Sequence, residues 1–456
     1  MDYVTKFLNK FEKKEYIKKN YSLDNIKYFL SILGNPQEKL KNIIHITGTN
    51  GKGSVANYVS KMLENLGFKV GLYTSPHIFR VNERICINHK PISDKVLNNY
   101  LGKIYDVGLS PHYVDYMDYL DCLDRLTYFE ILTCVMFLYF SEQDNDFNVL
   151  EVGLGGKLDA TNVISRSLIS VITKIGLDHT EVLGDTIRKI TLDKSEIIKP
   201  NSYCVLSNNS KEVRDIVKNV CKKRNVKLKI FGNDFGIKNV SFKGGRTIWF
   251  DYYGERKING LESYVLYKSQ PENIAVSIAI LELLKKVGKI KKFEVDKIRS
   301  ATKINFPSRF EFIEDRRKHF LGLTTQNLIF DGSHNPLAIK NFVNTIKMVG
   351  YKNILLCFTM MKEKDYKSCI KILSGIRNRI KKVLVYELPL TRGQSISFLY
   401  KEFTKYFAKK DVKKFYKVSS VLKFIKNFAK EYENIIFVGS LYAEKNFFGR
   451  KINKIL

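Results

Sequence analysis

A chain of 456 residues is too long for one ordinary hydrophobic core. Because domains usually hold roughly 100–200 residues, we expect two. The composition is 44% hydrophobic and 12% aromatic with only 9 prolines, which excludes an intrinsically disordered chain. The formal charge of +31 suggests a polyanionic partner, but lysines are spread along the whole chain with no basic tail and no nucleic-acid module. We therefore expect no specific nucleic-acid binding.

Targeting and membrane signals are absent from the pattern of apolar residues. The N-terminal residues through Lys19 mix acidic and basic side chains, and so offer no apolar core for a secretory signal. The most apolar helical stretch, residues 129–140, contains Glu130 and is shorter than the about 20 residues that a bilayer requires. We expect no membrane span and a cytoplasmic protein, with an organelle matrix as the alternative. The seven cysteines are scattered and never form Cys-x-x-Cys, so we expect free thiols.

Apolar, β-branched runs alternate with helical patterns in the first part of the chain. This alternation predicts the α/β class, with a parallel sheet covered by helices. Strands are expected at residues 42–47, 69–73, 147–152 and 168–174, and a helix at residues 55–66.

A second unit is expected after a helical pattern that runs from Asn273 to about Lys286. A charged stretch then leads to Pro307, where a helix cannot continue, and we place the domain boundary at residue 304. The expected domains are residues 1–304 and residues 305–456. In the second, strands at residues 328–331, 353–358, 383–387 and 434–438 alternate with helices, which predicts a smaller doubly wound, Rossmann-like unit.

A glycine-rich turn joins the first strand to the first helix. Backbone N–H groups of such a turn, together with the helix dipole, can surround phosphate oxygens, while Lys52 adds a positive charge and Ser54 a hydroxyl. The pattern departs from the generic P-loop, since Ile46 stands where its first glycine belongs and Gly53 separates Lys52 from Ser54. A plain glycine turn with a solvated lysine is the alternative interpretation. The candidate phosphate-binding residues are Gly48, Thr49, Asn50, Gly51, Lys52, Gly53 and Ser54.

Three segments resemble segments of one known family, and they occur in the order in which that family has them. The turn resembles the phosphate loop of the Mur-ligase superfamily, with the Gly-Ser ending of its folate branch. Residues 151–162 resemble the signature Glu-Val-Gly-Leu-Gly-Gly-Arg-Leu-Asp-Ala-Thr-Asn of the folylpolyglutamate synthase and dihydrofolate synthase family, with Lys157 in place of arginine. Residues 176–180 match its Gly-Leu-Asp-His-Thr segment. This resemblance implies a P-loop-type, Mur-ligase-like ATP- and folate-binding domain followed by a glutamate-ligase domain.

The resemblance also implies a magnesium site. Glu151 closes an apolar strand, and carboxylates at that position face the ligand crevice of an open α/β sheet. The family pattern makes Glu151, His179 and Ser75 the implied Mg²⁺ ligands, although from the residues alone Glu151 could be a cap and His179 a structural histidine. Lys194 matches a lysine that is carbamylated in the superfamily; because CO₂ adds only to a neutral amine, its pKa would have to be depressed. An exposed helix lysine is the alternative.

The folate side is implied by two further matches. Residues 74–77 resemble the family's Thr-Ser-Pro-His loop, and residues 126–130 its Leu-Thr-x-Phe-Glu segment, whose aromatic rings can stack on a pterin. Without the resemblance, the second segment predicts a helix start capped by Thr127. The implied folate-binding residues are Thr74, Pro76, His77, Arg84, Tyr128, Phe129, Gly155 and Asp159.

Nucleotide contacts are implied from the later part of the chain. Asn273 lies in a Gln-x-x-Asn pattern that contacts adenine in relatives, with helix capping as the rival explanation. Arg309 lies in a segment similar to Pro-Gly-Arg-x-Glu, whose arginine reaches the ATP phosphates, and residues 331–336 resemble Asp-Gly-Ala-His-Asn-Pro. Asp331 and His334 are therefore expected to contact the nucleotide.

The implied reaction is an ATP-dependent ligation. ATP passes its γ-phosphoryl group to a carboxylate of folate or dihydropteroate, with Mg²⁺ and Lys52 neutralising charge, and the amine of L-glutamate then attacks the acyl phosphate. The expected catalytic residues are Lys52, Glu151, His179 and Lys194. Family members usually work as monomers.

Two rivals remain at this point. A peptidoglycan Mur ligase would need a UDP-binding domain, for which the segment before Asn42 is too short. A non-catalytic basic nucleotide-binding protein is the other.

Overall fold

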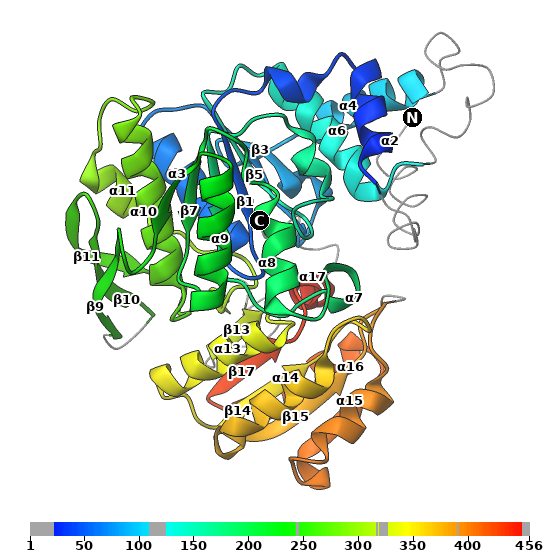
Figure 1. Cartoon of the computed structure of the whole chain (residues 1–456). Coiled ribbons are helices and arrows are strands. Elements are labelled where there is room, and N and C mark those ends of the chain that lie inside the picture. Colours follow the sequence, from blue (N-terminus) through cyan, green and yellow to red (C-terminus); the bar gives the residue numbers. More distant parts are fainter. Residues whose placement is uncertain are drawn as a thin grey trace. The chain divides into compact units, whose positions relative to one another are not determined.

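The computed structural model describes residues 22–108, 125–242, 246–315, 318, 327–389 and 392–448 (Figure 1). The chain divides into two compact units. The first comprises residues 1–238, 251–259 and 272–302, and the second comprises residues 239–250, 260–271 and 303–456. Both contain a sheet covered by helices, so the predicted α/β class is confirmed.

The first unit is built on an eight-stranded sheet with strand order β4-β3-β2-β5-β1-β6-β7-β8. The strands are β1 (Ile43–Thr47), β2 (Val70–Tyr73), β3 (Ile85–Ile87), β4 (Lys90–Pro91), β5 (Phe147–Glu151), β6 (Ile169–Ile172), β7 (Tyr203–Leu206) and β8 (Lys227–Ile230). All four expected strands are present, as β1, β2, β5 and β6. The short edge strands β3 and β4, which run antiparallel, were not expected.

Strand β1 has a central position in the sheet, and its apolar composition suits that position. Every residue of β1, β2, β5 and β6 is buried, as expected for parallel strands covered on both faces. β1 runs parallel to β5 on one side and to β6 on the other, with Ile46 opposite Glu151 and Thr47 opposite Ile172. The carboxyl ends of the three strands therefore meet at one edge.

Helices cover this sheet and connect its strands. They are α2 (Asp24–Ile32), α3 (Lys52–Asn65), α4 (Asp94–Gly108), α6 (Tyr128–Ser141), α7 (Thr180–Leu183), α8 (Ile187–Ser195), α9 (Lys211–Lys223), α10 (Gln270–Lys286) and α11 (Val295–Ala301). The predicted cap of α6 is confirmed, because the Thr127 hydroxyl accepts from the Glu130 N–H and the Glu130 carboxylate accepts from the Thr127 N–H. Helix α8 ends at Ser195, before Pro200. No helix in the described part of the chain is long and apolar enough to cross a membrane.

The structure contains a three-stranded sheet that the sequence patterns did not predict. Along its strands the chain crosses from one unit to the other. Its order is β11-β10-β9, formed by β9 (Gly236–Phe242), β10 (Ile248–Tyr253) and β11 (Lys257–Ser263). Glu282 of α10 binds the turn between β10 and β11, since its carboxylate accepts from the Glu255 and Arg256 N–H groups at 3.1 and 2.8 Å.

The second unit has a six-stranded sheet with order β12-β13-β17-β14-β15-β16. Its strands are β12 (Glu311–Phe312), β13 (Asn327–Asp331), β14 (Ile354–Phe358), β15 (Ile380–Tyr386), β16 (Val412–Phe415) and β17 (Asn434–Val438). Its helices are α13 (Pro336–Val349), α14 (Tyr366–Leu373), α15 (Ile396–Phe403), α16 (Val418–Phe428) and α17 (Tyr442–Phe448). The four expected strands are confirmed, and β17 lies between β13 and β14. The Phe330 and Phe437 rings stack across β13 and β17, with centroids 4.5 Å apart.

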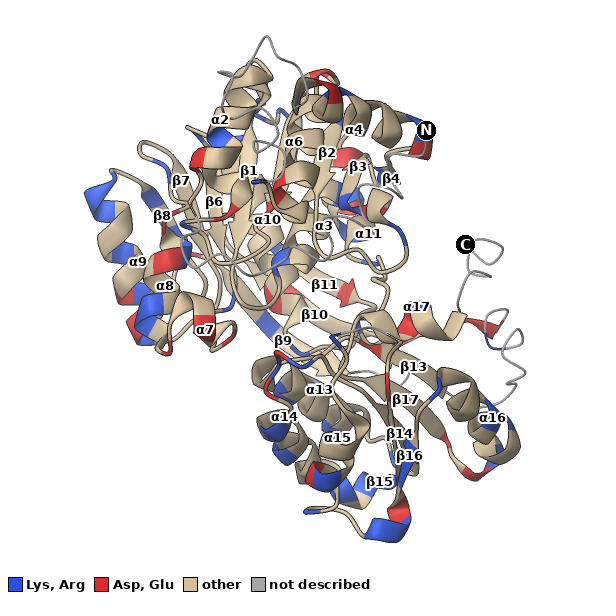
Figure 2. Ribbon diagram, turned by 90° about the vertical axis from the view of Figure 1, so that its right-hand side faces the viewer, with Lys and Arg blue, Asp and Glu red and all other residues tan. Residues whose placement is uncertain are grey.

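The charged residues and the cysteines follow the sequence-based expectations. Figure 2 shows Lys and Arg scattered over elements of both units, including α9 and α14. Cys122 lies outside the described residues. The described cysteines are all buried, namely Cys86, Cys134, Cys204, Cys221, Cys357 and Cys369.

Candidate active site

The glycine turn after β1 has a backbone that only glycine adopts easily. Gly48 and Gly51 have φ of 150° and 95°. A Cβ atom on Gly48 would lie 1.9 Å from Thr173 Oγ1, and one on Gly51 would lie 2.7 Å from Asn273 Oδ1. Both the positive φ and the close approach require glycine. The same contact brings Asn273, the expected adenine ligand at the start of α10, directly against the turn.

Part of the turn is already hydrogen-bonded within the protein. The N–H groups of Thr49 and Asn50 donate to the Lys174 carbonyl at 2.8 and 3.2 Å, which fixes the turn to the end of β6. The first N–H groups of any helix have no acceptor within that helix. The start of α3, which directly follows the glycine turn, is therefore the end of the helix whose dipole and N–H groups favour a phosphate.

Two lysines lie close together beside the turn. Lys52 Nζ donates to the Gly48 and Thr49 carbonyls at 3.1 and 3.4 Å. Lys194, on the last turn of α8, is 4% exposed. Burial, and then the positive charge of Lys52, lower the pKa of Lys194 to about 7, although Asp193 and Asp178 oppose the shift. A substantial fraction of Lys194 is therefore a neutral amine near neutral pH.

Glu151 ends β5 beside the start of α3. Its side chain is buried, and its Oε2 accepts from the Ser75 N–H at 3.0 Å. A Cβ on Gly53 would lie 3.4 Å from the same Oε2. The structure thus brings Glu151, Ser75 and the first turn of α3 together. Carboxylate and hydroxyl oxygens at a phosphate site suit Mg²⁺, which binds through one or two carboxylates and substrate oxygens.

His179 lies on the loop before α7, in the left-handed conformation with φ of 50°. Its N–H donates to Asp178 Oδ1 at 3.0 Å, and its Nε2 is 3.9 Å from the same oxygen. Since Asp178 acts on the Lys194 pKa, His179 belongs to the neighbourhood of Lys194 and Lys52. Within the described ranges no three His, Cys, Asp or Glu side chains group closely enough to hold a metal. An ion here would need serine and phosphate oxygens as well.

The loop after β5 packs against the end of α8. Gly155 has φ of 67°, and a Cβ there would lie 2.5 Å from Asp193 Oδ1. A Cβ on Gly156 would lie 2.8 Å from Lys194 Cα. Asp159 is buried and accepts from the Leu154 N–H and the Thr161 N–H at 2.9 and 3.0 Å. Asp159 therefore holds this glycine loop in shape, a role that its motif did not reveal.

The expected pterin residues also gather in one place. Arg84 Nε donates to His77 Nδ1 at 3.1 Å, and Arg84 Cζ lies 5.4 Å from the centre of the Tyr128 ring. The Arg84 carbonyl accepts from the Thr74 N–H at 3.0 Å. Pro76 follows Ser75 through a cis peptide bond in the same loop. Phe129 lies against Gly153, where a Cβ would be 2.6 Å from its ring. Positive and aromatic side chains thus line one region.

Tyr73 is a residue of this region that the sequence analysis missed. Its ring centre is 5.8 Å from that of Phe129, and its hydroxyl is 3.1 Å from Thr133 Oγ1. Its position as the last residue of β2 was the one feature that could have indicated a role in this region.

In the second unit, Asp331 is a buried hydrogen-bond acceptor at the end of β13. It accepts from the Tyr267 hydroxyl, from the Phe310 N–H at 3.1 Å and from the Ser333 N–H at 2.9 Å. These bonds hold the turn that carries Arg309, whose positive charge also acts on Asp331. His334 Nδ1 donates to the Gly332 carbonyl at 2.7 Å. Asp331 and His334 thus lie on the turn that follows β13, and Arg309 lies on the turn that Asp331 holds.

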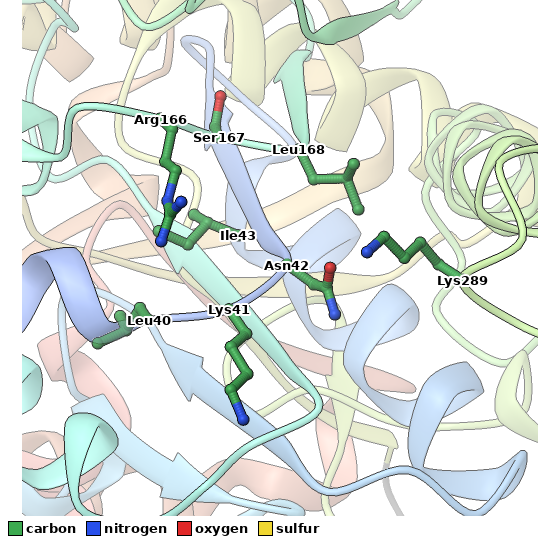
Figure 3. A pocket seen from close by; sticks show the side chains of 8 residues that line it. All are labelled: Leu40, Lys41, Asn42, Ile43, Arg166, Ser167, Leu168 and Lys289. Carbon is green, nitrogen blue, oxygen red and sulfur yellow. The ribbon is translucent and has the colours of Figure 1, made fainter.

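A pocket of about 340 Å³ lies elsewhere in the first unit (Figure 3). It is lined by Leu40, Lys41, Asn42, Ile43, Arg166, Ser167, Leu168 and Lys289. Except for Lys289, which follows α10, these residues precede or begin β1 and β6, so the pocket lies at the amino edge of the sheet. It is separate from the carboxyl edge that carries Lys52 and Glu151.

A parallel sheet whose central strand leads through a glycine turn into a helix, beside a buried carboxylate, defines a class of nucleotide-binding enzymes that hold phosphate at a helix N-terminus. Residues 46–281 match the model of the Mur ligase middle domain. The chain belongs to the family of folylpolyglutamate synthases and dihydrofolate synthases, and the predicted resemblance is confirmed.

Three known proteins illustrate the similarity. Folylpolyglutamate synthase of Lacticaseibacillus casei is 32% identical over 340 residues, which are 74% of this chain and 75% of the relative. Dihydrofolate synthase/folylpolyglutamate synthase of Bacillus subtilis is 31% identical over 363 residues, 78% of this chain and 80% of the relative. A solved FPGS–AMPPCP complex is 26% identical, has a TM-score of 0.80 and covers 99% of this chain and 100% of the relative.

Proposed function

We infer that this chain is an ATP-dependent carboxylate–amine ligase that joins L-glutamate to a carboxylate of folate or dihydropteroate. The observation that carries this inference is the contact of the buried Glu151 with Ser75 and with the first turn of α3, beside Lys52. Relatives of the same family are folylpolyglutamate and dihydrofolate synthases, and one solved relative is a complex with AMPPCP.

The residues divide the work as follows. The N–H groups at the start of α3 bind the ATP phosphates, and Lys52 turns from its carbonyl partners toward the γ-phosphate. Glu151, with the hydroxyls of Ser54 and Ser75 and with His179, would hold Mg²⁺. When bound, that ion neutralises phosphate charge. The Arg84, Tyr128 and Phe129 region orients the pterin ring so that the carboxylate at the other end of the substrate meets the γ-phosphate. The carboxylate takes the γ-phosphoryl group and ADP leaves, and glutamate's amine then attacks the acyl phosphate and displaces inorganic phosphate.

Lys194 supplies an anion to the same site after carbamylation. The support is its low pKa of about 7, caused by burial and then by Lys52, which leaves the amine able to attack CO₂. The reaction joins the amine nitrogen to the carbon of CO₂ and releases one proton to solvent. Exposure to ¹³C-labelled bicarbonate should give a carbamate signal in ¹³C NMR that is missing in Lys194→Met. Equal signals in both proteins would contradict this assignment.

Residues in the later part of the chain are assigned to nucleotide binding, each within its own unit. Asn273 contacts the adenine, while Arg309, Asp331 and His334 of the second unit contribute to nucleotide binding. In this proposal residues 1–304 bind ATP and folate, and residues 305–456 form the glutamate-ligase domain. The enzyme works as a monomer in the cytoplasm or an organelle matrix. Light scattering of the purified protein tests the monomeric state, and cell fractionation tests the location.

The deciding experiment supplies dihydropteroate and tetrahydrofolate separately, with ATP, Mg²⁺ and labelled glutamate, and identifies products by mass. The expected product carries one or more added glutamyl residues, and ATP hydrolysis depends on the acceptor. Lys52→Ala and Glu151→Gln should each lower turnover by about 10²–10³-fold, because they remove charge stabilisation at the phosphate. Lys218→Ala and Glu212→Gln, on the exposed face of α9, are the matched controls. Acceptor-independent ATP hydrolysis would contradict the ligase assignment.

A further inference from the structure

Two polar side chains interrupt the otherwise apolar strand β1. His45 and Thr47 stand among three isoleucines, and both are fully buried. Residues two apart on a strand share one face of the sheet. Their side chains are therefore directed to the same side, and both are linked by hydrogen bonds to the segment that follows β5.

His45 reaches this segment through Thr161. Its Nε2 is 2.7 Å from Thr161 Oγ1, and Thr161 Oγ1 donates to Asp159 Oδ1 at 2.5 Å. A hydroxyl has a single proton, so the proton between His45 and Thr161 belongs to Nε2. Among the described residues Nδ1 has no hydrogen-bond partner, which suits an unprotonated nitrogen. The chain of donors therefore runs from His45 to Thr161 and ends on the Asp159 carboxylate.

Thr47 reaches the same segment directly, because its hydroxyl donates to the Gly155 carbonyl at 2.6 Å. Gly155 and Gly156 in turn pack against Asp193 and Lys194, with no room for a Cβ. The glycine loop is thus fixed to β1 on one side and lies against the end of α8 on the other.

We propose that His45 and Thr47 are positioning residues: acting through Thr161 and Gly155, they set the glycine loop, residues 153–159, in register with the phosphate turn that leaves the same strand. The proposal rests on the ligase function above. One strand then places both the ATP phosphates and the loop beside Lys194 and the pterin region, so that the two substrates meet in a fixed geometry. Such alignment acts on the rate of the bound complex more than on ATP binding.

The kinetic test compares, at each threonine, a variant that lacks the hydroxyl with a variant that keeps it. Thr161→Val and Thr47→Val keep the shape of the side chain and remove the hydrogen bond, whereas Thr161→Ser and Thr47→Ser retain it. We expect both valine variants to lower kcat by about 10-fold or more, with the KM for ATP changed less than about two-fold, because a misplaced loop disturbs alignment. The serine variants should recover most of the turnover.

Thr302→Val is the matched control for a loss of stability alone. Thr302 is a fully buried threonine of the first unit whose hydroxyl donates to the Arg299 carbonyl at the end of α11. It should lower the melting temperature as the other valine variants do, and leave kcat unchanged. Equal kcat in Thr161→Val and the wild type, or equal losses in Thr161→Val and Thr161→Ser, would overturn the proposal.

A readout that needs no catalysis separates this proposal from the ligase assignment. In Thr161→Val, hydrogen exchange at the Leu154 and Thr161 amides, both donors to Asp159, should accelerate by about 10-fold in the substrate-free protein. Thr302→Val should leave these amides unchanged. Unaltered exchange in Thr161→Val would refute the link to the loop, even if the wild type were to make no glutamyl product.

Discussion

At the scale of single residues, Lys194 shows how burial can prepare a side chain for chemistry. Its folded-state pKa of about 7 lies below its ordinary value of 10.5. Between these values the unfolded chain binds more protons than the folded one, so stability rises with pH. In CO₂-free buffer we expect the free energy of unfolding to rise from pH 7 to pH 10. In Lys194→Met this slope should be smaller, by an amount that corresponds to at most one bound proton. Parallel curves for the two proteins would show that Lys194 is not buried as described.

Gly51 permits a second prediction with a matched control. Gly51 and Gly67 have nearly the same φ, 95° and 96°, but a Cβ on Gly51 would lie 2.7 Å from Asn273 Oδ1, whereas Gly67 has open space around it. Gly67→Ala should cost about 1 kcal/mol through backbone strain alone. Gly51→Ala should cost more and should also weaken nucleotide affinity, measured by calorimetric titration. Equal affinity in the two variants would argue against a role of Asn273 at the turn.

Residue patterns predicted much of the candidate site, but not how its members contact one another. The family motifs led to Lys52, Glu151 and Lys194, and the structure places them at one edge of a sheet. Tyr73 was missed because its partners, Phe129 and Thr133, lie far away in sequence. The bond of Thr161 to His45 was missed for the same reason, although Thr161 itself lies in the signature at residues 151–162.

At the scale of elements, the start of α6 is stabilised by a reciprocal cap. The Thr127 hydroxyl accepts from the Glu130 N–H at 3.2 Å, and the Glu130 carboxylate accepts from the Thr127 N–H at 2.7 Å. Thr127→Ala should lower the free energy of unfolding by about 1 kcal/mol, measured by urea denaturation, while Thr127→Ser should lower it far less. A serine variant as unstable as the alanine variant would show that the methyl group, not the cap, stabilises the helix.

Elements were predictable where burial dominates their sequence. Strands such as β5 and β14 are buried at every residue and mostly apolar, and both were expected within a residue or two of their bounds. The two-residue strands β4 and β12 carry too few residues for any periodicity. Strand β9 is mostly exposed or half-buried, so its side chains give no apolar signal, and the three-stranded sheet that contains it went unpredicted.

At the scale of the whole molecule, the formal charge of +31 predicts a dependence on salt. Self-repulsion destabilises a compact chain, and dissolved ions screen charges beyond roughly 10 Å at 0.1 M. The melting temperature should therefore rise between low salt and about 0.3 M KCl. Sucrose at equal osmolality serves as the control for solvent effects. A melting temperature that falls with KCl would show that attractive ion pairs outweigh repulsion.

Chain connectivity explains what local patterns could not provide. Residues 239–250 and 260–271 belong to the second unit although they precede Lys303. Their residues Ile248, Val265 and Tyr267 pack in one core cluster with Ile329 and Ile436. Assignment to a unit depends on such long-range packing, which short windows of sequence do not contain.

The place of β17 has a consequence for biosynthesis. This strand lies between β13 and β14, yet residues 434–438 are synthesised after every other strand of the second unit. While the ribosome is still translating, β13 and β14 each have an unpaired inner edge, and the sheet cannot close. The second unit therefore completes its folding only after β17 has left the ribosome, so a nascent chain that stalls earlier exposes unpaired strand edges to chaperones and proteases.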